Sequence, residues 1–179
     1  MKNVIPAASF LLLFSTAAMA QTDVATVTKK EERKEKKEIR RENKEVSFQS
    51  KQHFLNDFPG AKNPYWSATI NFDEVTFTNN GVKTTAYYDF DSELVGTTII
   101  KSFSDIPAKA QQNIKTHYKG YKVSDVIMFD DNEANETDMV LYNTPFQDED
   151  NYFVSLKSSK ETIILKVNME GEVSFFKKV

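Results

Sequence analysis

Apolar and polar positions follow two different periods along residues 47–179. Apolar residues three or four apart are typical of an amphipathic helix, whereas strict alternation is typical of a half-buried strand. Ile106, Ala110, Ile114 and Tyr118 lie four apart and predict a helix. Alternation predicts strands at 68–72, 74–78, 82–90, 94–100, 122–129, 152–156, 162–167 and 172–176.

Small and polar residues predict where these elements begin and end. Serine is a favoured N-cap, which predicts helix starts at Ser47 or Ser50 and at Ser104. Gly60 and Gly120 predict left-handed C-caps. The run 79–81 (Asn-Asn-Gly) predicts a tight hairpin turn.

The body of the chain has an internal repeat. The residues Phe54, Phe58, Gly60 and Lys62 correspond to Ile114, Tyr118, Gly120 and Lys122 at an offset of 114 − 54 = 60. The hairpins 89–94 and 168–173 correspond at an offset of 79, which predicts about nineteen extra residues between 130 and 150. We therefore predict an α+β fold, a tandem repeat of a helix plus an antiparallel β-meander, with the helices packed on one face of the sheet. The repeats span about 47–103 and 104–179.

The first twenty residues form a different kind of segment. An apolar run that is too short to span a bilayer ends in Ala18-Met19-Ala20, the small-residue pattern of a signal-peptide cleavage site. We predict cleavage after Ala20 and a periplasmic or secreted mature protein. No later segment has the length and apolarity of a membrane span, so none is predicted.

Residues 21–46 form a charged arm. Lys29–Glu45 holds nine basic and six acidic residues, whereas residues 46–179 hold thirteen basic and nineteen acidic ones. Only Ile39 is apolar within Lys29–Glu45, so no apolar stripe would hold a helix against the body. The arm is predicted to be helical or disordered in solvent, or alternatively to contact a membrane or a polyanion. The formal charge of −3 argues against nucleic-acid binding by the whole chain.

Residues with catalytic or metal-binding potential are sparse. The chain has no cysteine and no serine-hydrolase, zinc-protease or phosphate-loop motif. His53 and His117 are predicted to lie on helix surfaces. Acidic groups cluster at 130–133, 148–150 and 89–93, which predicts solvated loops and, as an alternative, a calcium site. A glycosylation sequon occupies 135–137. We predict that the protein is not an enzyme and has no catalytic residue, cofactor or metal site.

Adjacent aromatic residues suggest a binding surface. The pairs are Tyr65-Trp66, Tyr87-Tyr88 and Phe175-Phe176. Neighbours in a strand point to opposite faces, so one member of each pair should point away from the helices. Tyr88 shares its face with Phe90 and is predicted to point inward, which leaves Trp66 and Tyr87 as candidate partner contacts. The alternative is a sheet that is covered on both faces.

The order of these signals resembles the PepSY-like, beta-lactamase-inhibitor-like (BLIP-like) domains of secreted bacterial proteins. The resemblance covers about 47–179 and is carried by 54–60 with Trp66, 86–94, 104–107, 114–122 and 168–173. It implies helices on one face of an antiparallel sheet and a free concave face that holds a partner.

The predicted function is a non-enzymatic periplasmic or secreted protein-binding module. The partner would be another envelope protein rather than nucleic acid, and no oligomeric state is predicted. The alternatives are an inhibitor of a secreted hydrolase, or a binder of a small ligand or metal ion on the open sheet face.

Overall fold

The computed structural model describes residues 31, 34, 35, 38, 45–147 and 149–179. The chain divides into two compact units, 1–35 and 36–179. The predicted signal peptide, 1–20, lies outside the described residues, as does most of the predicted arm. Glu31, Lys34, Glu35 and Glu38 are helical and exposed. The predicted boundaries of the arm and of the two repeats stay predictions.

Residues 45–147 and 149–179 hold two α-helices, one short 3-10 helix and ten strands. In chain order they are α2 (Phe48–Asp57), β1 (Lys62–Ala68), β2 (Asp73–Asn79), β3 (Val82–Tyr88), β4 (Leu94–Lys101), η1 (Phe103–Asp105), α3 (Ala108–His117), β5 (Lys122–Asp131), β6 (Met139–Leu141), β7 (Thr144–Phe146), β8 (Asn151–Lys157), β9 (Thr162–Asn168) and β10 (Val173–Lys178).

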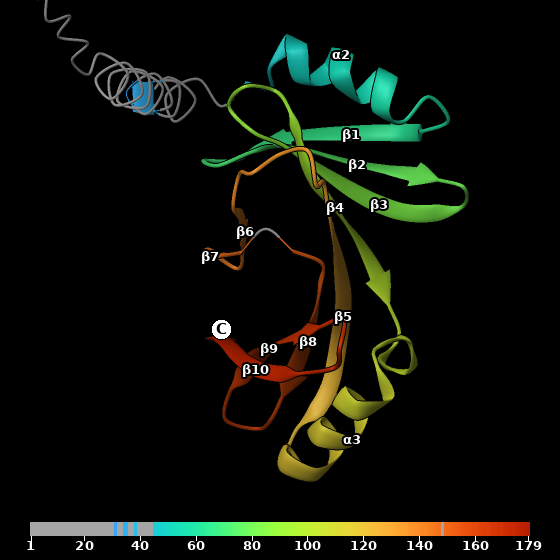
Figure 1. Cartoon of the computed structure of the whole chain (residues 1–179), viewed down its shortest axis with the longest axis vertical. Coiled ribbons are helices and arrows are strands. Elements are labelled where there is room, and N and C mark those ends of the chain that lie inside the picture. The colour runs from blue at the N-terminus through green and yellow to red at the C-terminus, as the bar shows by residue number, and fades with distance from the viewer. Residues whose placement is uncertain (1–30, 32–33, 36–37, 39–44, 148) are drawn as a thin grey trace, which may run out of the picture. The chain divides into compact units, whose positions relative to one another are not determined.

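Eight of these strands form one continuous antiparallel sheet in the order β1-β2-β3-β4-β5-β8-β9-β10 (Figure 1). The strands β6 and β7 pair only with each other. The prediction of an α+β tandem repeat of helix plus meander is wrong. β4 pairs with β5 from Gly96↔Asp131 to Lys101↔Val126, so the strands continue across the middle of the chain as one sheet. Since the described residues from 45 onward place two ten-residue α-helices beside eight sheet strands, the fold is closer to all-β.

Helix α2 begins directly after the predicted serine, Ser47, and ends two residues before a proline. The Ser47 hydroxyl accepts a hydrogen bond from the Gln49 N–H at 3.2 Å and so caps a free backbone donor. Ser50, the other candidate cap, is buried instead. The last helical bond runs from the Phe58 N–H to the Phe54 carbonyl, and Pro59 follows.

Helix α3 begins later than predicted, after Pro107. Ser104 lies in η1, where Ser102 and Asp105 form the capping box. Gly60 and Gly120 do not adopt the predicted left-handed conformation. Each helix is instead followed by a turn in which a backbone N–H donates to the carbonyl three residues earlier. The Ala61 N–H donates to the Phe58 carbonyl, and the Tyr121 N–H donates to the Tyr118 carbonyl. Within the described residues, no helix has the length and apolarity needed to cross a bilayer.

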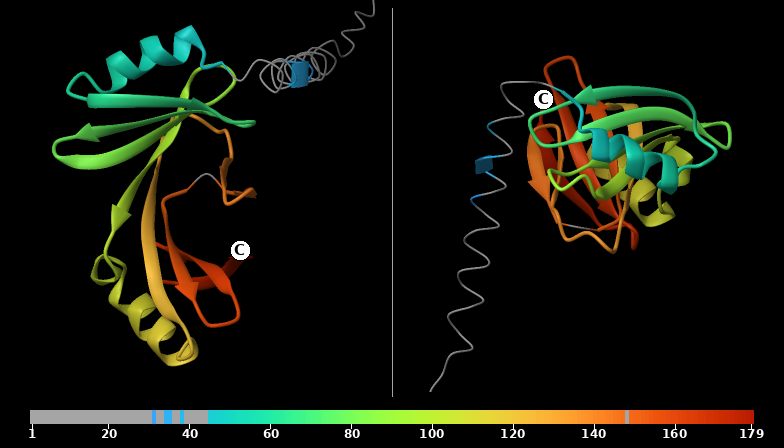
Figure 2. Two further views of the ribbon diagram at one scale, coloured as in Figure 1. Left: turned by 180° about the vertical axis from the view of Figure 1, so that it is seen from behind. Right: turned by 90° about the horizontal axis from the view of Figure 1, so that it is seen from above.

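Figure 2 shows α2 and α3 beside different strands, and each helix packs into its own cluster of buried residues. The buried cluster at α2 consists of Phe54 from the helix and of Val75, Phe77, Ala86 and Tyr88 from the strands. At α3 the buried residues are Ile106, Ala110, Ile114, Val126, Tyr152, Val154, Leu156, Ile163, Leu165 and Val167. Phe58 and Tyr118 are half-buried at the edges of these clusters, whereas Phe54 and Ile114, one turn earlier, are buried.

Three features of the N-terminal strands can be compared with the predicted pattern or help to explain it. The strand predicted at 68–72 is wrong, because Thr69 closes a turn there and its N–H binds the Phe72 carbonyl at 2.8 Å. The predicted turn at 79–81 is confirmed, and Asn80 and Gly81 have φ angles of 48° and 83°. Gly96 lets β4 approach β5 closely, because a Cβ there would lie 2.6 Å from the Phe129 ring.

Replacing Phe54 with alanine should lower the free energy of unfolding by roughly 3–5 kcal/mol, the range for an emptied aromatic site. The side chain is 3% exposed and its ring lies 5.0 Å from that of Phe77 and 5.4 Å from that of Trp66. Leu55→Ala is the control in the same helix, because Leu55 is 59% exposed and should lose less than about 1 kcal/mol. Urea denaturation of both variants measures the difference, and equal losses would contradict the packing of α2.

Candidate functional site

The register of the sheet assigns residues to two faces, because partners opposite each other in an antiparallel pair point the same way. We call one side the helix face; it contains the pairs Val75↔Ala86 and Val126↔Val154, which lie under α2 and α3. The other side is the hairpin face. One row of paired residues crosses seven strands on it: Tyr65, Thr76, Thr85, Thr98, Phe129, Asn151 and Asn168.

The β6–β7 hairpin covers the part of the hairpin face that belongs to β5, β8 and β9, and its cluster extends to Tyr87 of β3 and Val95 of β4. Met139, Leu141 and Phe146 are buried against it. The Phe146 ring centroid lies 5.3 Å from that of Phe129 and 4.8 Å from that of Phe153, both in edge-on contact. These aromatic contacts fix the hairpin on the sheet and remove that area from solvent.

The tip of the hairpin is held in an uncommon conformation. Tyr142 and Asn143 have φ angles of 52° and 58°, a left-handed pair that gives a tight two-residue turn. The Lys177 ammonium donates a hydrogen bond to the Tyr142 carbonyl, which ties the tip to β10. Burial, followed by the charge of Asp125, raises the pKa of Tyr142 and keeps its hydroxyl protonated.

Over β1–β4 the hairpin face is open in part, away from the buried Tyr87 and Thr98. We call Tyr65, Thr76, Lys83, Thr85 and Ile100 the open patch. Tyr65 is 74% exposed and Ile100 is 69% exposed, both unusual for large apolar side chains on a sheet. The hydroxyl oxygens of Thr76 and Thr85 lie 2.9 Å apart between them, so the floor of the patch is a row of hydrogen-bonded threonines on rigid strands.

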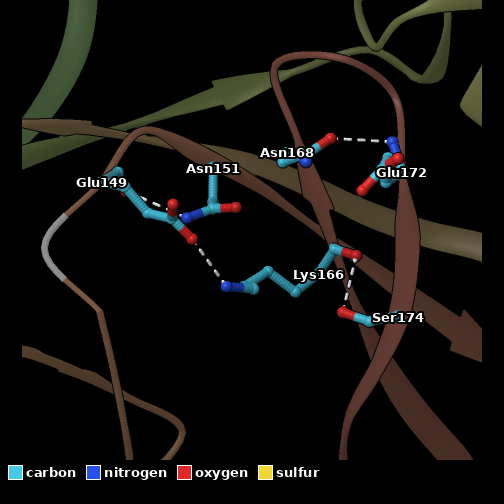
Figure 3. A network of polar contacts seen from close by, with 6 residues as sticks. All are labelled: Glu149, Asn151, Lys166, Asn168, Glu172 and Ser174. Atoms are coloured by element: carbon cyan, nitrogen blue, oxygen red, sulfur yellow. Dashed lines mark hydrogen bonds and ion pairs between the residues drawn. The ribbon is translucent and has the colours of Figure 1, made fainter.

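A polar network occupies the C-terminal edge of the hairpin face (Figure 3). The Lys166 ammonium donates to the Glu149 carboxylate at 2.9 Å, and this bond lowers the pKa of Glu149. The buried Asn151 amide donates to the Glu149 backbone carbonyl at 3.0 Å. The Glu172 N–H donates to the Asn168 side-chain oxygen at 2.8 Å. These charges neutralise one another, so this edge is a structural network rather than a charged docking surface.

The two candidate contacts from the sequence are not displayed on the open patch. Trp66 is half-buried on the helix face, where its ring contacts those of Phe54 and Tyr88. Tyr87 points to the hairpin face, but its side chain is only 9% exposed, because Phe72 from the β1–β2 turn packs on it. Tyr88 is buried on the helix face, as its predicted inward orientation requires. A contact role for Trp66 and Tyr87 stays a prediction.

Ser50, Ser92, Asp73 and His53 form a cluster whose residue types could belong to a catalytic site. The Ser50 hydroxyl donates to the Asp73 carboxylate at 2.7 Å and both residues are fully buried. His53 Nδ1 lies 2.6 Å from the Ser92 carbonyl oxygen rather than from a serine hydroxyl. A nucleophile needs access to substrate, and the fully buried Ser50 hydroxyl has none. The cluster attaches α2 to the β2 and β3–β4 segments.

The predicted glycosylation sequon is part of a second structural network. Asn135 is buried, and its amide donates to the Leu94 carbonyl at 3.1 Å and lies 3.4 Å from an Asp89 carboxylate oxygen. The Thr137 hydroxyl donates to the same carboxylate at 3.1 Å. Asp89 also accepts the backbone N–H groups of Asp91 and Glu93. The asparagine therefore holds the 132–137 segment on the β3–β4 turn and is not presented to solvent.

Two of the three acidic clusters, 130–133 and 148–150, lie next to each other, and the third lies in the β3–β4 turn. Asp89 and Glu93 belong to the turn just described, and the Asp150 carboxylate accepts the Asp131 N–H at 2.8 Å. Among the described residues, no three acidic or histidine side chains are grouped so that they could hold a metal ion. Asp148 lies outside the described residues.

Sequence reasoning missed the residues that make this face distinctive. The sequence pattern selects Trp66 rather than Tyr65 as a candidate partner contact, and it identifies Ile100 only as the last residue of a strand. The β6–β7 hairpin was missed because its strands are three residues each, too short for alternation to be recognised. The pair Tyr142-Asn143 between two short apolar runs was the one available signal.

Burial, more than any other cause, raises the pKa of Tyr87 to about 12 from an ordinary value of 10.0. The folded state therefore holds this proton more tightly than the unfolded state, and stability should fall as the pH rises from about 10 to about 12. In Tyr87→Phe this fall should be smaller by about 2–3 kcal/mol, since each pKa unit corresponds to roughly 1.4 kcal/mol. Urea denaturation at pH 9 and at intervals up to pH 12 measures both proteins, and parallel curves would contradict the buried position.

Comparisons with known proteins agree with this architecture at the level of fold. No protein-family model matches the chain, and no curated protein matches it in sequence. A DUF2874 family protein from Bacteroides uniformis ATCC 8492 has a similar structure, with a TM-score of 0.62 and 14% identity over 75% of this chain and 91% of that one.

Two further solved structures are similar. A BLIP-like protein from Bacteroides fragilis NCTC 9343 has a TM-score of 0.57 and 14% identity, covering 75% of this chain and 87% of that one. A candidate periplasmic protein from Bacteroides eggerthii DSM 20697 has a TM-score of 0.60 and 14% identity, covering 75% and 90%. The comparisons do not show a PepSY-like relation. The chain has the fold of BLIP-like and DUF2874 proteins of Bacteroides.

Proposed function

We propose that the mature protein is a periplasmic protein-binding module without catalytic activity, and that it contacts another envelope protein through the open patch. The observation that carries the proposal is the exposure of Tyr65 and Ile100 on either side of a hydrogen-bonded threonine row. Aromatic anchors supply much of the binding energy at protein interfaces. Anchors on a rigid sheet also lose little conformational entropy when they bind.

The rest of the hairpin face supports this assignment. Its C-terminal part is occupied by the packed hairpin and by the internally paired Lys166–Glu149 network. A partner that approaches this face therefore meets apolar and hydroxyl groups only over β1–β4. In this proposal Tyr87 does not contact the partner. It supports the patch from within the fold, because its hydroxyl lies 3.0 Å from the Thr98 hydroxyl, beside Thr85 in the threonine row.

The comparisons support the cellular location and the kind of activity by analogy of fold. One similar structure is a candidate periplasmic protein and another is BLIP-like. Folds host many functions, so the binding role rests on the open patch rather than on this likeness. The predicted signal peptide, residues 1–20, is consistent with export.

Tyr65→Ala should abolish partner binding while leaving the fold intact, because Tyr65 lies in an edge strand and is mostly exposed. Phe175→Ala is the matched control: Phe175 is 62% exposed in the other edge strand, β10, and pairs with Leu165 of the helix face. The partner is first isolated from the envelope fraction with the mature wild-type chain. Its affinity for the purified wild-type and variant chains is then measured by calorimetry.

We expect Tyr65→Ala to weaken binding by at least about tenfold and Phe175→Ala to change it by less than about twofold, as expected for a hot spot and a remote residue. Ile100→Ala should weaken binding as well. Unchanged affinity in both Tyr65→Ala and Ile100→Ala, with normal melting curves, would contradict binding at the open patch.

A further inference from the structure

A groove of about 390 Å³ lies within the open patch on the hairpin face. It is formed by the halves of β1, β2 and β3 that lie nearest the β2–β3 turn, and its lining residues are Asn63, Tyr65, Thr76, Phe77, Thr78 and Lys83. Three of these residues, Tyr65, Thr76 and Lys83, already belong to the open patch. The patch therefore offers a recess as well as exposed anchors.

A bulge in the edge strand β1 forms one wall of the groove. Asn63 and Pro64 together lie opposite Phe77, where regular pairing would place a single residue. Asn63 has a φ angle of 53°, a left-handed conformation that asparagine adopts more readily than most residues. Bulges of this kind bend a strand and change the direction of its side chains. Because of the bulge, Lys62 and Tyr65 lie on the same face although they are three apart in sequence.

The end of the groove nearest the turn is positively charged. Lys62 and Lys83 both pair with Thr78, one from each neighbouring strand, so all three point to the hairpin face. Both lysines are exposed, and neither forms an ion pair within the part of the chain that the structure describes. Among the described residues that line the groove, Lys83 is the only charged one.

The acidic groups of the same face lie away from these lysines. Along β1–β3 and their turns the acidic residues are Asp73, which is buried on the helix face, and Glu74. Glu74 is on the hairpin face but four residues from Thr78, roughly 13 Å along a strand. Asp125 of β5 is two strands from β3, about 10 Å across the sheet. The acidic segment 130–138 is attached to the β3–β4 turn, at the other end of β3.

A side chain with a single carboxylate matches both properties of the groove. Its oxygens can accept charge-assisted hydrogen bonds from Lys62 and Lys83, and its stem can pack on the exposed Tyr65 ring. A polyanion matches less well, because residues 46–179 hold nineteen acidic and thirteen basic residues and would repel it outside the groove. The local charge therefore favours one acidic residue of a protein segment as the occupant.

We propose that the groove binds an aspartate or glutamate side chain of the envelope protein that docks on the open patch, with the carboxylate at Lys62 and Lys83 and the stem along Tyr65. This inference rests on the proposed function, because it describes the partner of the same patch. It adds that the segment of the partner that enters the patch is acidic.

The test uses the full-length chain labelled with ¹⁵N and the peptide acetyl-Gly-Val-Glu-Val-Gly-amide as the probe. Amide shifts are followed during titration, in parallel with an analogue that has glutamine in place of glutamate and with acetate as a free carboxylate. The groove variant combines Lys62→Met with Lys83→Met. The matched control combines Lys119→Met with Lys122→Met, which makes the same change in net charge at two exposed lysines outside the groove lining.

We expect saturable shifts at Tyr65, Thr78 and Lys83. The glutamate peptide should bind at least about fivefold more tightly than the glutamine analogue, in keeping with two partly exposed ion pairs. This preference should fall below about twofold in the groove variant and persist in the control, because a double-mutant comparison isolates the contact between the two groups. Acetate should bind at least about tenfold more weakly than the peptide, since it lacks the flanking residues that cover Tyr65.

Five results would overturn the proposal. The first is equal affinity for the two peptides, and the second is an equal loss of preference in both variants, which would indicate attraction to the overall charge. The third is equal affinity for acetate, which would make the groove a small-anion site. The fourth is the absence of saturable shifts at the groove. The fifth is a concentration-dependent shift there without peptide, which would identify a second copy of the chain as the occupant.

Failure of this inference is distinguishable from failure of the proposed function. If the peptides show no preference for glutamate but Tyr65→Ala still abolishes binding of the isolated envelope protein, the open patch binds a partner that is not acidic at this point. If Tyr65→Ala and Ile100→Ala both leave the affinity for that protein unchanged, the proposed function itself is contradicted, whatever the peptides do.

Discussion

The antiparallel pairing of β4 with β5 is the interaction on which the rest of the structure depends. It joins the four N-terminal strands to the four C-terminal strands as one sheet, through six pairs from Gly96↔Asp131 to Lys101↔Val126. Gly96 permits this approach, because any larger residue would meet the Phe129 ring. The two helices then pack over separate clusters on either side of the β4–β5 junction, and the middle of the helix face stays uncovered.

The same pairing determines what remains open on the other face. The β6–β7 hairpin connects β5 to β8, so it covers the strands near that connection, and its cluster extends no further than Tyr87 and Val95 and the adjoining Phe72. Thr76 and Thr85, on β2 and β3, are half-buried and Ile100, on β4, is exposed, whereas Thr98 is buried. The open patch is therefore a consequence of where the covering elements are attached, and it does not require a specialised loop.

The edges of the sheet are protected, which favours recognition through a face. In β1, Pro64 lacks a backbone donor and the register shifts between Lys62 and Tyr65. In β10 the register shifts between Phe175 and Lys177, and a second lysine follows. Prolines, bulges and edge lysines each hinder the addition of another strand. Continuation of the sheet into a second molecule is thus disfavoured at both ends.

Alternation predicted most strands of the sheet from β2 to β10 close to their observed positions, because a strand with one buried face has a strict period of two. It failed at β1, where Lys62–Ala68 carries a proline and mostly exposed side chains. The local pattern also could not show that both meanders join into one sheet, since the β4–β5 register is a long-range feature. For the same reason it placed Tyr88 correctly in the core but could not show that Phe72 covers Tyr87.

Solvent accessibility of two isoleucine methyl groups on the hairpin face tests the central claim most directly. Ile100 is 69% exposed and Ile164 is 1% exposed, although both point to this face. In methyl spectra of the full-length chain, a soluble gadolinium chelate should broaden the Ile100 signal strongly and leave the Ile164 signal sharp. Equal protection of the two methyl groups would contradict an open patch beside a covered one.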